Sequence, residues 1–408
     1  MTTTASLPSS RPFSPGSRYH LFIPGPSPVP DRILRELSMP TIDHRGPEFA
    51  ILGQRVLQGM QTIFQTRHPV VIYPASGTGA WEAALVNTLN PGDQVLMYET
   101  GHFATLWYQM AKRLGFSPEI LSEPGLCPTT QLPLAWRNPV SAERILARLL
   151  ADPEHQIKAV CVVHNETSTG VTSDIASVRA ALDEAEHPAL LLVDTISGLG
   201  SLPYRHDAWG VDVSISGAQK GLMLPAGISF NALSPKAIAV ARQNLHPKAY
   251  WAWDDILDMN TRGYWPYTPN TNLLFGLAAA IDLLHEEGLE AVFERHRRLA
   301  RACRAAVQAW GLPIHCQSAT AYSAVLTGVM LPADVNADEV RNQIYDTYHV
   351  ALGAGLGKLS RRMFRIGHLG KCSEVDLLGV LAAVELGLRR SRVPLAGHGL
   401  EAAMQYLA

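Results

Sequence analysis

Short apolar runs alternate with stretches of helical periodicity between about residue 70 and residue 220. The apolar runs are nearly continuous in Val, Leu and Ile, and they span residues 70–73, 94–98, 157–164, 189–194 and 211–215. Strands that are buried on both faces of a parallel sheet have this composition. Helical patterns fill the intervals, at residues 80–89, 103–114, 142–150 and 174–185. The alternation predicts an α/β domain built on a mainly parallel sheet.

The pattern changes near residue 290, where a smaller α+β domain is expected to begin. The expected elements are a helix over 293–310, strands around 314 and at 324–331, a helix at 337–348, a strand at 363–366 and a helix at 373–389. The first 20 residues are rich in Ser, Thr and Pro and lack the apolar stretch of a signal peptide. We therefore expect a flexible arm over residues 1–20, a large domain over 21–289 and a small domain over 290–408.

Composition narrows the class of protein. Of the 408 residues, 47% are hydrophobic and 17% charged, the net charge is −2, and like charges never form a run of five. This balance favours neither nucleic acid nor an anionic membrane as a partner. The five scattered cysteines form no disulfide framework, which indicates a reducing compartment and a cytoplasmic location. The 15 histidines form no ligand cluster, so no metal site is expected.

A glycine-rich segment, PASGTGAWEAALVNTL over residues 74–89, joins a predicted strand to a predicted helix. Ser76, Gly77 and Thr78 lie where that helix begins, and free N–H groups and the helix dipole favour an anion such as phosphate there. Alternatively, Ser76 or Thr78 is only a helix cap. The segment lacks the third glycine of a dinucleotide-binding fingerprint, and the chain has no Walker A motif.

An acid and a lysine follow two predicted strands. Asp194 ends the apolar run LLLVD, where a buried carboxylate requires a cationic partner. Lys220 follows the next strand among small residues, a setting suited to an amine activated for Schiff-base chemistry. Taken singly, Asp194 can be a structural cap or ion-pair partner and Lys220 a surface lysine. Together they suit pyridoxal 5′-phosphate, whose ring nitrogen an acid keeps protonated and whose aldehyde a lysine bonds.

Eight sequence blocks, in order along the chain, extend this interpretation to a family. The chain resembles the class V, fold-type-I pyridoxal-phosphate aminotransferases, specifically the serine–glyoxylate and alanine–glyoxylate group. The blocks are FIPGPSPVP, DHRGPEF, PASGTGAWEAAL, HNETSTG, VDTISGLGS, SISGAQKG, YWPYTPNT and FRIGHLG. The resemblance implies a large domain with a mainly parallel sheet of the seven-stranded type, flanked by helices, and a smaller C-terminal α+β domain.

The resemblance also implies contacts with the cofactor. Ser76, Gly77 and Thr78 match the phosphate-binding turn of the family. Phe103 matches the aromatic residue that stacks on the pyridine ring, and Thr167 matches the hydroxyl that binds the phenolic oxygen.

The remaining cofactor contacts lie later in the chain. Asp194 matches the partner of the pyridinium nitrogen, Gln219 a phosphate contact and Lys220 the Schiff-base lysine. Thr268 matches a phosphate contact that the other subunit of a homodimer supplies. One of three neighbouring aromatic residues is expected to assist it, namely Tyr264, Trp265 or Tyr267.

Two further positions match substrate contacts in the family. Arg365 matches the arginine that binds the substrate carboxylate, and its forked guanidinium suits that ligand independently of the resemblance. Gly25 matches the N-terminal segment that lines the substrate pocket, and residues 43–45 are expected near the partner's active site.

The implied reaction moves the amino group of a small L-amino acid to glyoxylate, which becomes glycine. L-Serine, giving hydroxypyruvate, is the first expectation, and L-aspartate and L-alanine are the alternatives. An aspartate donor requires a second cation, for which Arg45 and Arg262 are candidates. A cysteine desulfurase-like enzyme is a remote alternative that requires a reactive cysteine, by position Cys316 or Cys372. A non-enzymatic binding protein would not need Asp194 and Lys220 together.

Overall fold

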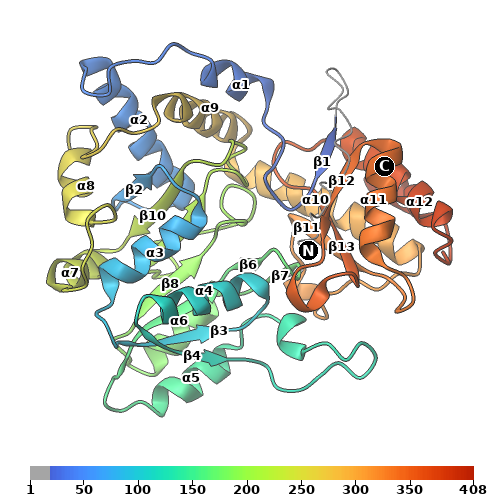
Figure 1. The fold of residues 1–408 in the computed structure, drawn as a ribbon, viewed down its shortest axis with the longest axis horizontal. Coiled ribbons are helices and arrows are strands. Elements are labelled where there is room, and N and C mark those ends of the chain that lie inside the picture. The colour runs from blue at the N-terminus through green and yellow to red at the C-terminus, as the bar shows by residue number, and fades with distance from the viewer. Residues whose placement is uncertain (1–18) are drawn as a thin grey trace, which may run out of the picture.

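The computed structural model describes residues 19–408, which form two larger sheets, each covered by helices, and one two-stranded sheet (Figure 1). The expected flexible arm lies outside the described residues except for its last two positions. One of these, His20, begins strand β1 (His20–Phe22). Within the described residues, no helix combines the length and apolar character that crossing a membrane requires.

The larger sheet has seven strands in the order β2-β10-β9-β8-β5-β3-β4. All neighbouring strands are parallel except at β10, which runs antiparallel to both β2 and β9. This arrangement confirms the predicted mainly parallel α/β sheet. Its strands are β2 (Val70–Tyr73), β3 (Gln94–Tyr98), β4 (Ser117–Leu121), β5 (Ile157–Val163), β8 (Leu190–Asp194), β9 (Val213–Gly217) and β10 (Ser229–Leu233).

Helices flank this sheet, and several begin at side chains that accept the free N–H groups of the first turn. Asp174 caps α6 through the N–H groups of Ala176 and Ser177, and Ser141 caps α5. The helices of this part are α1 (Asp31–Leu37), α2 (Pro47–Phe64), α3 (Gly77–Thr88), α4 (His102–Arg113), α5 (Ala142–Leu150), α6 (Ile175–Glu184), α7 (Pro235–Gln243), α8 (Trp253–Asn260) and α9 (Thr271–Glu287).

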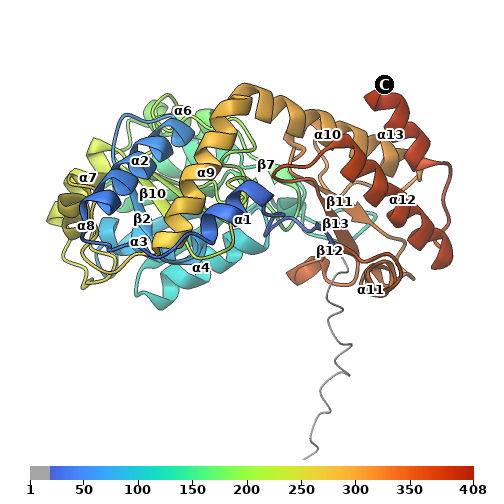
Figure 2. The same cartoon turned by 90° about the horizontal axis from the view of Figure 1, so that it is seen from above.

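The smaller sheet has four strands in the order β1-β12-β13-β11. It comprises β11 (Leu326–Met330), β12 (Val350–Ala354), β13 (Met363–Gly367) and β1, and it packs with α10 (Leu289–Ala309), α11 (Ala337–Tyr348), α12 (Glu374–Arg390) and α13 (Gly399–Leu407). Figure 2 shows these helices gathered at one end of the molecule. The strand expected around Ile314 is wrong, because Ile314 forms only an isolated bridge with Val329.

The beginning of the described chain lies in the C-terminal sheet. Strand β1 pairs in parallel with β12, so residues 20–22 extend a sheet whose other strands follow residue 325. In Figure 1, β1 is the blue strand beside the orange strands. The loop after β1 then leads back to the large sheet. It passes so close to Gly367 that a methyl group there would lie 2.3 Å from the Ile23 carbonyl oxygen. The boundary predicted at residue 21 therefore separates two residues that belong to one strand.

Candidate functional site

The carboxyl ends of three adjacent strands bring the sequence-predicted residues together. Strands β9, β8 and β5 are neighbours in the sheet and run parallel, so their carboxyl ends share one edge. Asp194 is the last residue of β8, and Lys220 follows the end of β9. Thr167 lies just beyond β5, in the turn between the short strands β6 (Asn165–Glu166) and β7 (Val171–Thr172).

A cavity of about 120 Å³ opens at this edge of the sheet. Eight of the residues singled out from the sequence line it, together with five further residues. The lining consists of Ser76, Gly77, Thr78, Trp81, Phe103, Val163, Asn165, Thr167, Asp194, Ile196, Ser197, Gln219 and Lys220. The cavity thus joins an acid, an amine and a helix start.

Asp194 is a buried carboxylate held by two donors. The Trp81 indole Nε1 donates to Oδ2 over 2.9 Å, and the Ile196 amide donates to Oδ1 over 2.7 Å. Burial raises the pKa of Asp194 to about 7, against the lowering effect of these hydrogen bonds and of Lys220. A cationic ligand in the cavity would favour the ionised form of Asp194.

Lys220 is packed against the loop that follows β1. Its Nζ donates to the Pro24 carbonyl over 2.7 Å, and the Ser27 hydroxyl donates to the Lys220 carbonyl over 2.8 Å. Gly25 has a φ of +110°, and a methyl group there would lie 2.3 Å from the Lys220 Nζ, so only glycine fits. Burial and the charge of Arg365 lower the pKa of Lys220 to about 8.

The start of α3 presents donors toward the cavity. Ser76 occupies the N-cap position, yet its side chain accepts no hydrogen bond from the helix. A methyl group on Gly77 would lie 2.3 Å from Ile196 Cδ1, so the backbone approaches closely here. Among the described residues, the Gln219 Oε1 is buried without a hydrogen-bond partner. These polar groups remain available to a ligand.

Arg365 reaches the site from the smaller sheet. It pairs with Gly328 of β11 and Gly353 of β12, so glycines flank it on both sides. Its Nη1 donates to the Thr167 carbonyl over 2.6 Å and its Nε to the Ala354 carbonyl over 2.9 Å. Burial lowers the pKa of Arg365 to about 10, and the charge of Glu166 opposes that shift.

Thr268 is the predicted site residue that lies apart from this cavity. Its side chain is exposed, and it is not among the residues that line the cavity of its own chain. The nearby aromatic residues differ in role. Trp265 is buried and donates to the Ile72 carbonyl, whereas Tyr267 stacks on Tyr250 with a centroid distance of 4.6 Å.

Several lining residues were missed from the sequence. Trp81 donates directly to Asp194, and its position one helical turn after Gly77 on α3 was a signal that could have identified it. Asn165 and Ser197 bond each other over 2.8 Å beside the cavity. The Pro24 carbonyl, which accepts from Lys220, had no signal in the sequence, because a backbone contact leaves no side-chain pattern.

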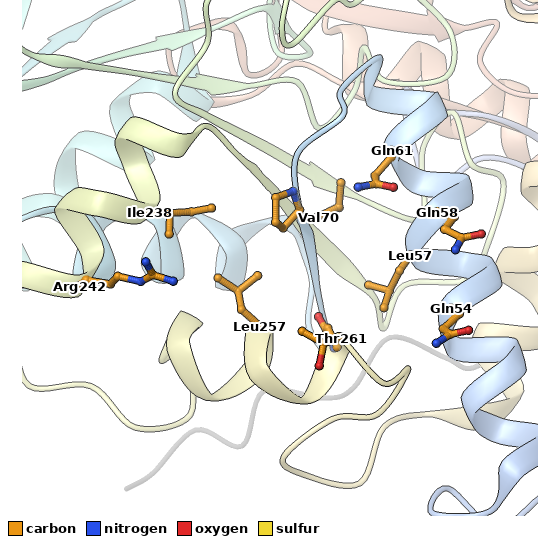
Figure 3. A pocket seen from close by; sticks show the side chains of 11 residues that line it. Gln54, Leu57, Gln58, Gln61, Val70, Ile238, Arg242, Leu257 and Thr261 are labelled. Atoms are coloured by element: carbon orange, nitrogen blue, oxygen red, sulfur yellow. The ribbon is translucent and has the colours of Figure 1, made fainter.

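A second hollow of about 420 Å³ lies away from the strand ends, between α2, α7 and α8 (Figure 3). Its polar lining includes Gln54, Gln58, Gln61 and Arg242. It contains none of the residues predicted for the site, and Arg242 has no buried acid beside it. Of these two cavities, the smaller one therefore contains the acid, the amine and the helix start that the sequence predicted for the site.

Comparison with known proteins agrees with this geometry. The family model described as aminotransferase class V matches residues 41–357. The chain belongs to this family. The match spans β2 to β12 and covers Asp194 and Lys220, whereas Arg365 and Gly25 lie beyond its limits.

Relatives match over nearly the full length of the chain. A serine–glyoxylate aminotransferase of Methylorubrum extorquens is 44% identical, with 96% of each chain covered. An L-aspartate–glyoxylate aminotransferase of Paracoccus denitrificans is 40% identical, again with 96% of each covered. Among solved structures, the ureidoglycine–glyoxylate aminotransferase of Bacillus subtilis superposes with a TM-score of 0.86 at 26% identity, covering 96% of this chain and 98% of that one. The chain is thus an aminotransferase with the predicted fold.

Proposed function

We propose that this protein is a pyridoxal-phosphate-dependent transaminase that moves the amino group of L-serine to glyoxylate, giving hydroxypyruvate and glycine. The proposal rests on the convergence of Asp194, Lys220 and the start of α3 on one cavity. Arg365 adjoins this cavity, because it donates a hydrogen bond to the carbonyl of Thr167, one of the lining residues. The 44% identity to a serine–glyoxylate aminotransferase supports the choice of substrates.

The polar groups of the cavity fit the cofactor. Asp194 would hold the ring nitrogen, Lys220 would bond the aldehyde carbon, and Phe103 would face the ring. The free N–H groups at Ser76 and Gly77, with the Thr78 hydroxyl and the Gln219 amide nitrogen as side-chain donors, would hold the phosphate. When bound, the cofactor supplies an electron sink for the charge that develops at the substrate Cα.

Lys220 is suited to move the proton at the substrate Cα. Burial and Arg365 lower its pKa to about 8, so a fraction of the amine is neutral near pH 7 and can accept a proton. The Pro24 carbonyl, 2.7 Å from Nζ, orients the amine. With the cofactor bound, the buried Asp194 carboxylate would favour a positive charge on the ring nitrogen.

Arg365 is suited to hold the substrate carboxylate. Two of its nitrogens are fixed by the Thr167 and Ala354 carbonyls, which leaves Nη2 and the outer edge of the guanidinium for a bidentate partner. Fixing the carboxylate fixes the direction of the Cα–H bond relative to Lys220, and such orientation accounts for much of the rate enhancement in intramolecular reactions.

The donor is small and carries one carboxylate. Lys220 is the single cation that lines the cavity of one chain in the described structure. Arg45 and Arg262, the two candidates for a second carboxylate, are exposed, and Arg262 contacts Met259. The lack of a second cation among the cavity residues of the same chain favours serine. Aspartate stays the alternative, because Arg45 is expected near the partner's active site and a relative at 40% identity is an aspartate–glyoxylate aminotransferase.

A homodimer in the cytoplasm completes the proposal. Thr268 is exposed on its own chain, as expected for a residue that would contact the phosphate bound by a partner subunit. The five cysteines are unpaired and buried, which suits a reducing compartment. Burial also raises the pKa of Cys316 to about 11 and of Cys372 to about 12. Inert thiols of this kind disfavour the desulfurase alternative.

Steady-state kinetics of the purified protein with pyridoxal phosphate test the function. We expect kcat/KM with glyoxylate to be higher for serine than for aspartate or alanine. Lys220→Ala should be inactive and lose the visible absorbance of covalently bound cofactor. Activity that survives this substitution would refute the mechanism, and a preference for aspartate would refute the donor.

A further inference from the structure

Glu166 is a fully buried carboxylate that the mechanism above does not use. It ends β6, and its exposed fraction is 0%. Its neighbour Thr167 lines the cavity and accepts a hydrogen bond from Arg365. A buried carboxylate is costly unless donors or cations surround it. Its partners therefore show what this side chain does.

The partners of Glu166 tie two parts of the site together. Its Oε2 accepts from the Ala104 amide over 3.1 Å, and its Oε1 lies 3.4 Å from the Phe103 amide, both in the first turn of α4. The same Oε1 accepts from the amide and the hydroxyl of Ser168, over 3.0 and 2.6 Å. The carboxylate thus fastens the helix that carries Phe103 to the turn that carries Thr167.

Ser168 and Gly101 complete this junction. The Ser168 hydroxyl donates to Glu166 and accepts from the His102 amide over 2.9 Å. A methyl group on Gly101 would lie 2.4 Å from the Ser168 oxygen and 2.5 Å from Glu166 Cγ. The close approach leaves no space for water or for a longer side chain. The turn at Thr167 is therefore held in one position relative to α4.

The negative charge of Glu166 has no ion-pair partner nearby. Among residues 19–408, no Lys, Arg or His nitrogen forms a salt bridge with it; N–H donors and the α4 dipole stabilise it instead. Burial lowers the pKa of Arg365, and the charge of Glu166 acts in the opposite direction. The carboxylate is thus electrostatically coupled to Arg365 without touching it.

We propose that Glu166 is a positioning residue for the substrate carboxylate, because it fixes the turn whose Thr167 carbonyl holds Arg365. This inference rests on the proposed function, since it assigns Arg365 to the substrate carboxylate. Glu166 itself contacts neither substrate nor cofactor. Its effect reaches the substrate through the hydrogen bond of 2.6 Å between Arg365 and Thr167.

The test measures binding of glycolate to the holoenzyme by calorimetry. Glycolate has the carboxylate of glyoxylate but no carbonyl or amine, so it binds without turnover. Glu166→Gln keeps the volume but replaces one of the two acceptor oxygens by a donor, so the bonds to α4 and to the Thr167 turn cannot all form. We expect about tenfold weaker glycolate binding, a similar rise of KM for both serine and glyoxylate, and a smaller change of kcat.

Two matched variants separate the role of this junction from general stability. Ser168→Ala removes only one of the donors to Glu166 and should weaken glycolate binding by less than threefold. Asp152→Asn removes another buried carboxylate, which accepts from the Gln156 and Ile157 amides at the opposite end of β5. It should lower thermal stability and leave glycolate binding unchanged. Equal effects of Glu166→Gln and Asp152→Asn on glycolate binding would overturn the proposal.

A double-mutant cycle shows whether Glu166 acts through Arg365. In an Arg365→Ala background, Glu166→Gln should no longer change the affinity for glycolate. Additive effects would overturn the proposal. If Glu166→Gln does not fold, Glu166→Asp replaces it in the same cycle, and its effect on glycolate affinity should likewise disappear in the Arg365→Ala background.

A wild-type protein that binds glycolate but has no transaminase activity would refute the proposed function. The double-mutant cycle could still be measured in that case, because it depends only on glycolate binding.

Discussion

The two sheets contribute to the site in different ways. The large sheet delivers Asp194 and Lys220 from the ends of adjacent parallel strands, so their spacing follows from the strand register. Arg365 lies in the middle of β13 in the small sheet. Its side chain reaches the carbonyl of Thr167, which follows β6 at the edge of the large sheet. The proposed cofactor contacts Asp194 and Lys220 therefore come from one sheet, whereas the proposed substrate contact Arg365 depends on packing between the two sheets.

This difference predicts which perturbations act on chemistry and which act on substrate binding. Changes at the ends of the large-sheet strands should lower kcat. Changes at the small sheet, or at its contact with the large domain, should raise KM instead.

After loss of Lys220, the largest effect is expected at Asp194. Asp194→Asn removes the buried negative charge from the ring nitrogen and should lower kcat by about 100- to 1,000-fold, the range typical for loss of one preorganised electrostatic group. Stopped-flow measurement of the first half-reaction with serine checks this. A kcat within threefold of wild type would contradict the role of Asp194.

The same variant should have the opposite effect on the cofactor-free protein. Burial raises the pKa of Asp194 to about 7 in the folded protein, whereas the same carboxyl group in the unfolded chain ionises near pH 4. The free energy of unfolding of the wild type therefore falls as the pH rises from about 4 to 7. Asp194→Asn has no group to ionise and should not show this fall. We expect the cofactor-free variant to be more stable than wild type at about pH 8 by roughly 2 kcal/mol. Denaturant unfolding of both proteins at about pH 5 and pH 8 measures it.

Arg365→Lys should change KM more than kcat. Lysine keeps the charge but cannot form two parallel hydrogen bonds with a carboxylate or keep both carbonyl contacts. We expect KM for serine and for glyoxylate to rise about 30- to 100-fold. Initial-rate kinetics decide the matter, and a fall of kcat at constant KM would place Arg365 in the chemistry instead.

An acid-sensitive contact should distinguish the stabilities of the two domains. Burial disfavours ionised Glu385, but hydrogen bonds from Trp310 and Arg389 dominate and lower its pKa to about 2. Because the folded pKa is depressed, the stabilisation is present above about pH 4.5 and is lost as the pH falls toward 2. Glu385→Gln should cost roughly 2 kcal/mol at neutral pH and progressively less in acid. Hydrogen exchange in α12 and α13 reports on this domain alone.

The smallest effect is expected where Lys358 of the small domain meets Glu99 of the large domain. Their side chains lie 3.1 Å apart, and the Trp136 indole donates to the same carboxylate oxygen over 2.6 Å. Lys358 is half exposed, and exposed ion pairs contribute below about 1 kcal/mol. Lys358→Ala should raise KM for serine about two- to threefold, and high salt should raise KM of the wild type by a similar factor, because salt screens the ion pair. A larger effect on kcat than on KM would contradict the expectation that this contact acts on substrate binding.

The strongly patterned parts of the fold were predictable. The helix over 337–348 matches α11, and the strands around Asp194 and Val160 lie where continuous apolar runs placed them. Strands β4 and β10 were not predicted, because β4 carries Pro118 and Glu119 and β10 carries Asn231, which interrupt the apolar pattern. Strand β9 begins two residues later than predicted and continues through Ser216 and Gly217, whose small side chains gave no periodic signal.

The candidate site was predictable where the chemistry lies in local motifs. Ser76, Thr167, Asp194 and Lys220 each follow a strand signal or belong to a recognisable block, and they all line one cavity. Trp81, Glu166 and the Pro24 carbonyl were missed, because their partners are distant in the sequence: Trp81 donates to Asp194, 113 residues away, and Lys220 donates to Pro24, 196 residues away.

Local periodicity and short motifs were sufficient to specify the fold class, the family and the order of the proposed cofactor-binding residues. The tertiary structure alone decided that β1 joins the C-terminal sheet, that Arg365 is held by the Thr167 carbonyl, and that Glu166 links α4 to that turn. Such contacts follow from the packing of segments that are far apart along the chain. Their hydrogen bonds involve backbone groups that every residue carries, so no residue pattern records them.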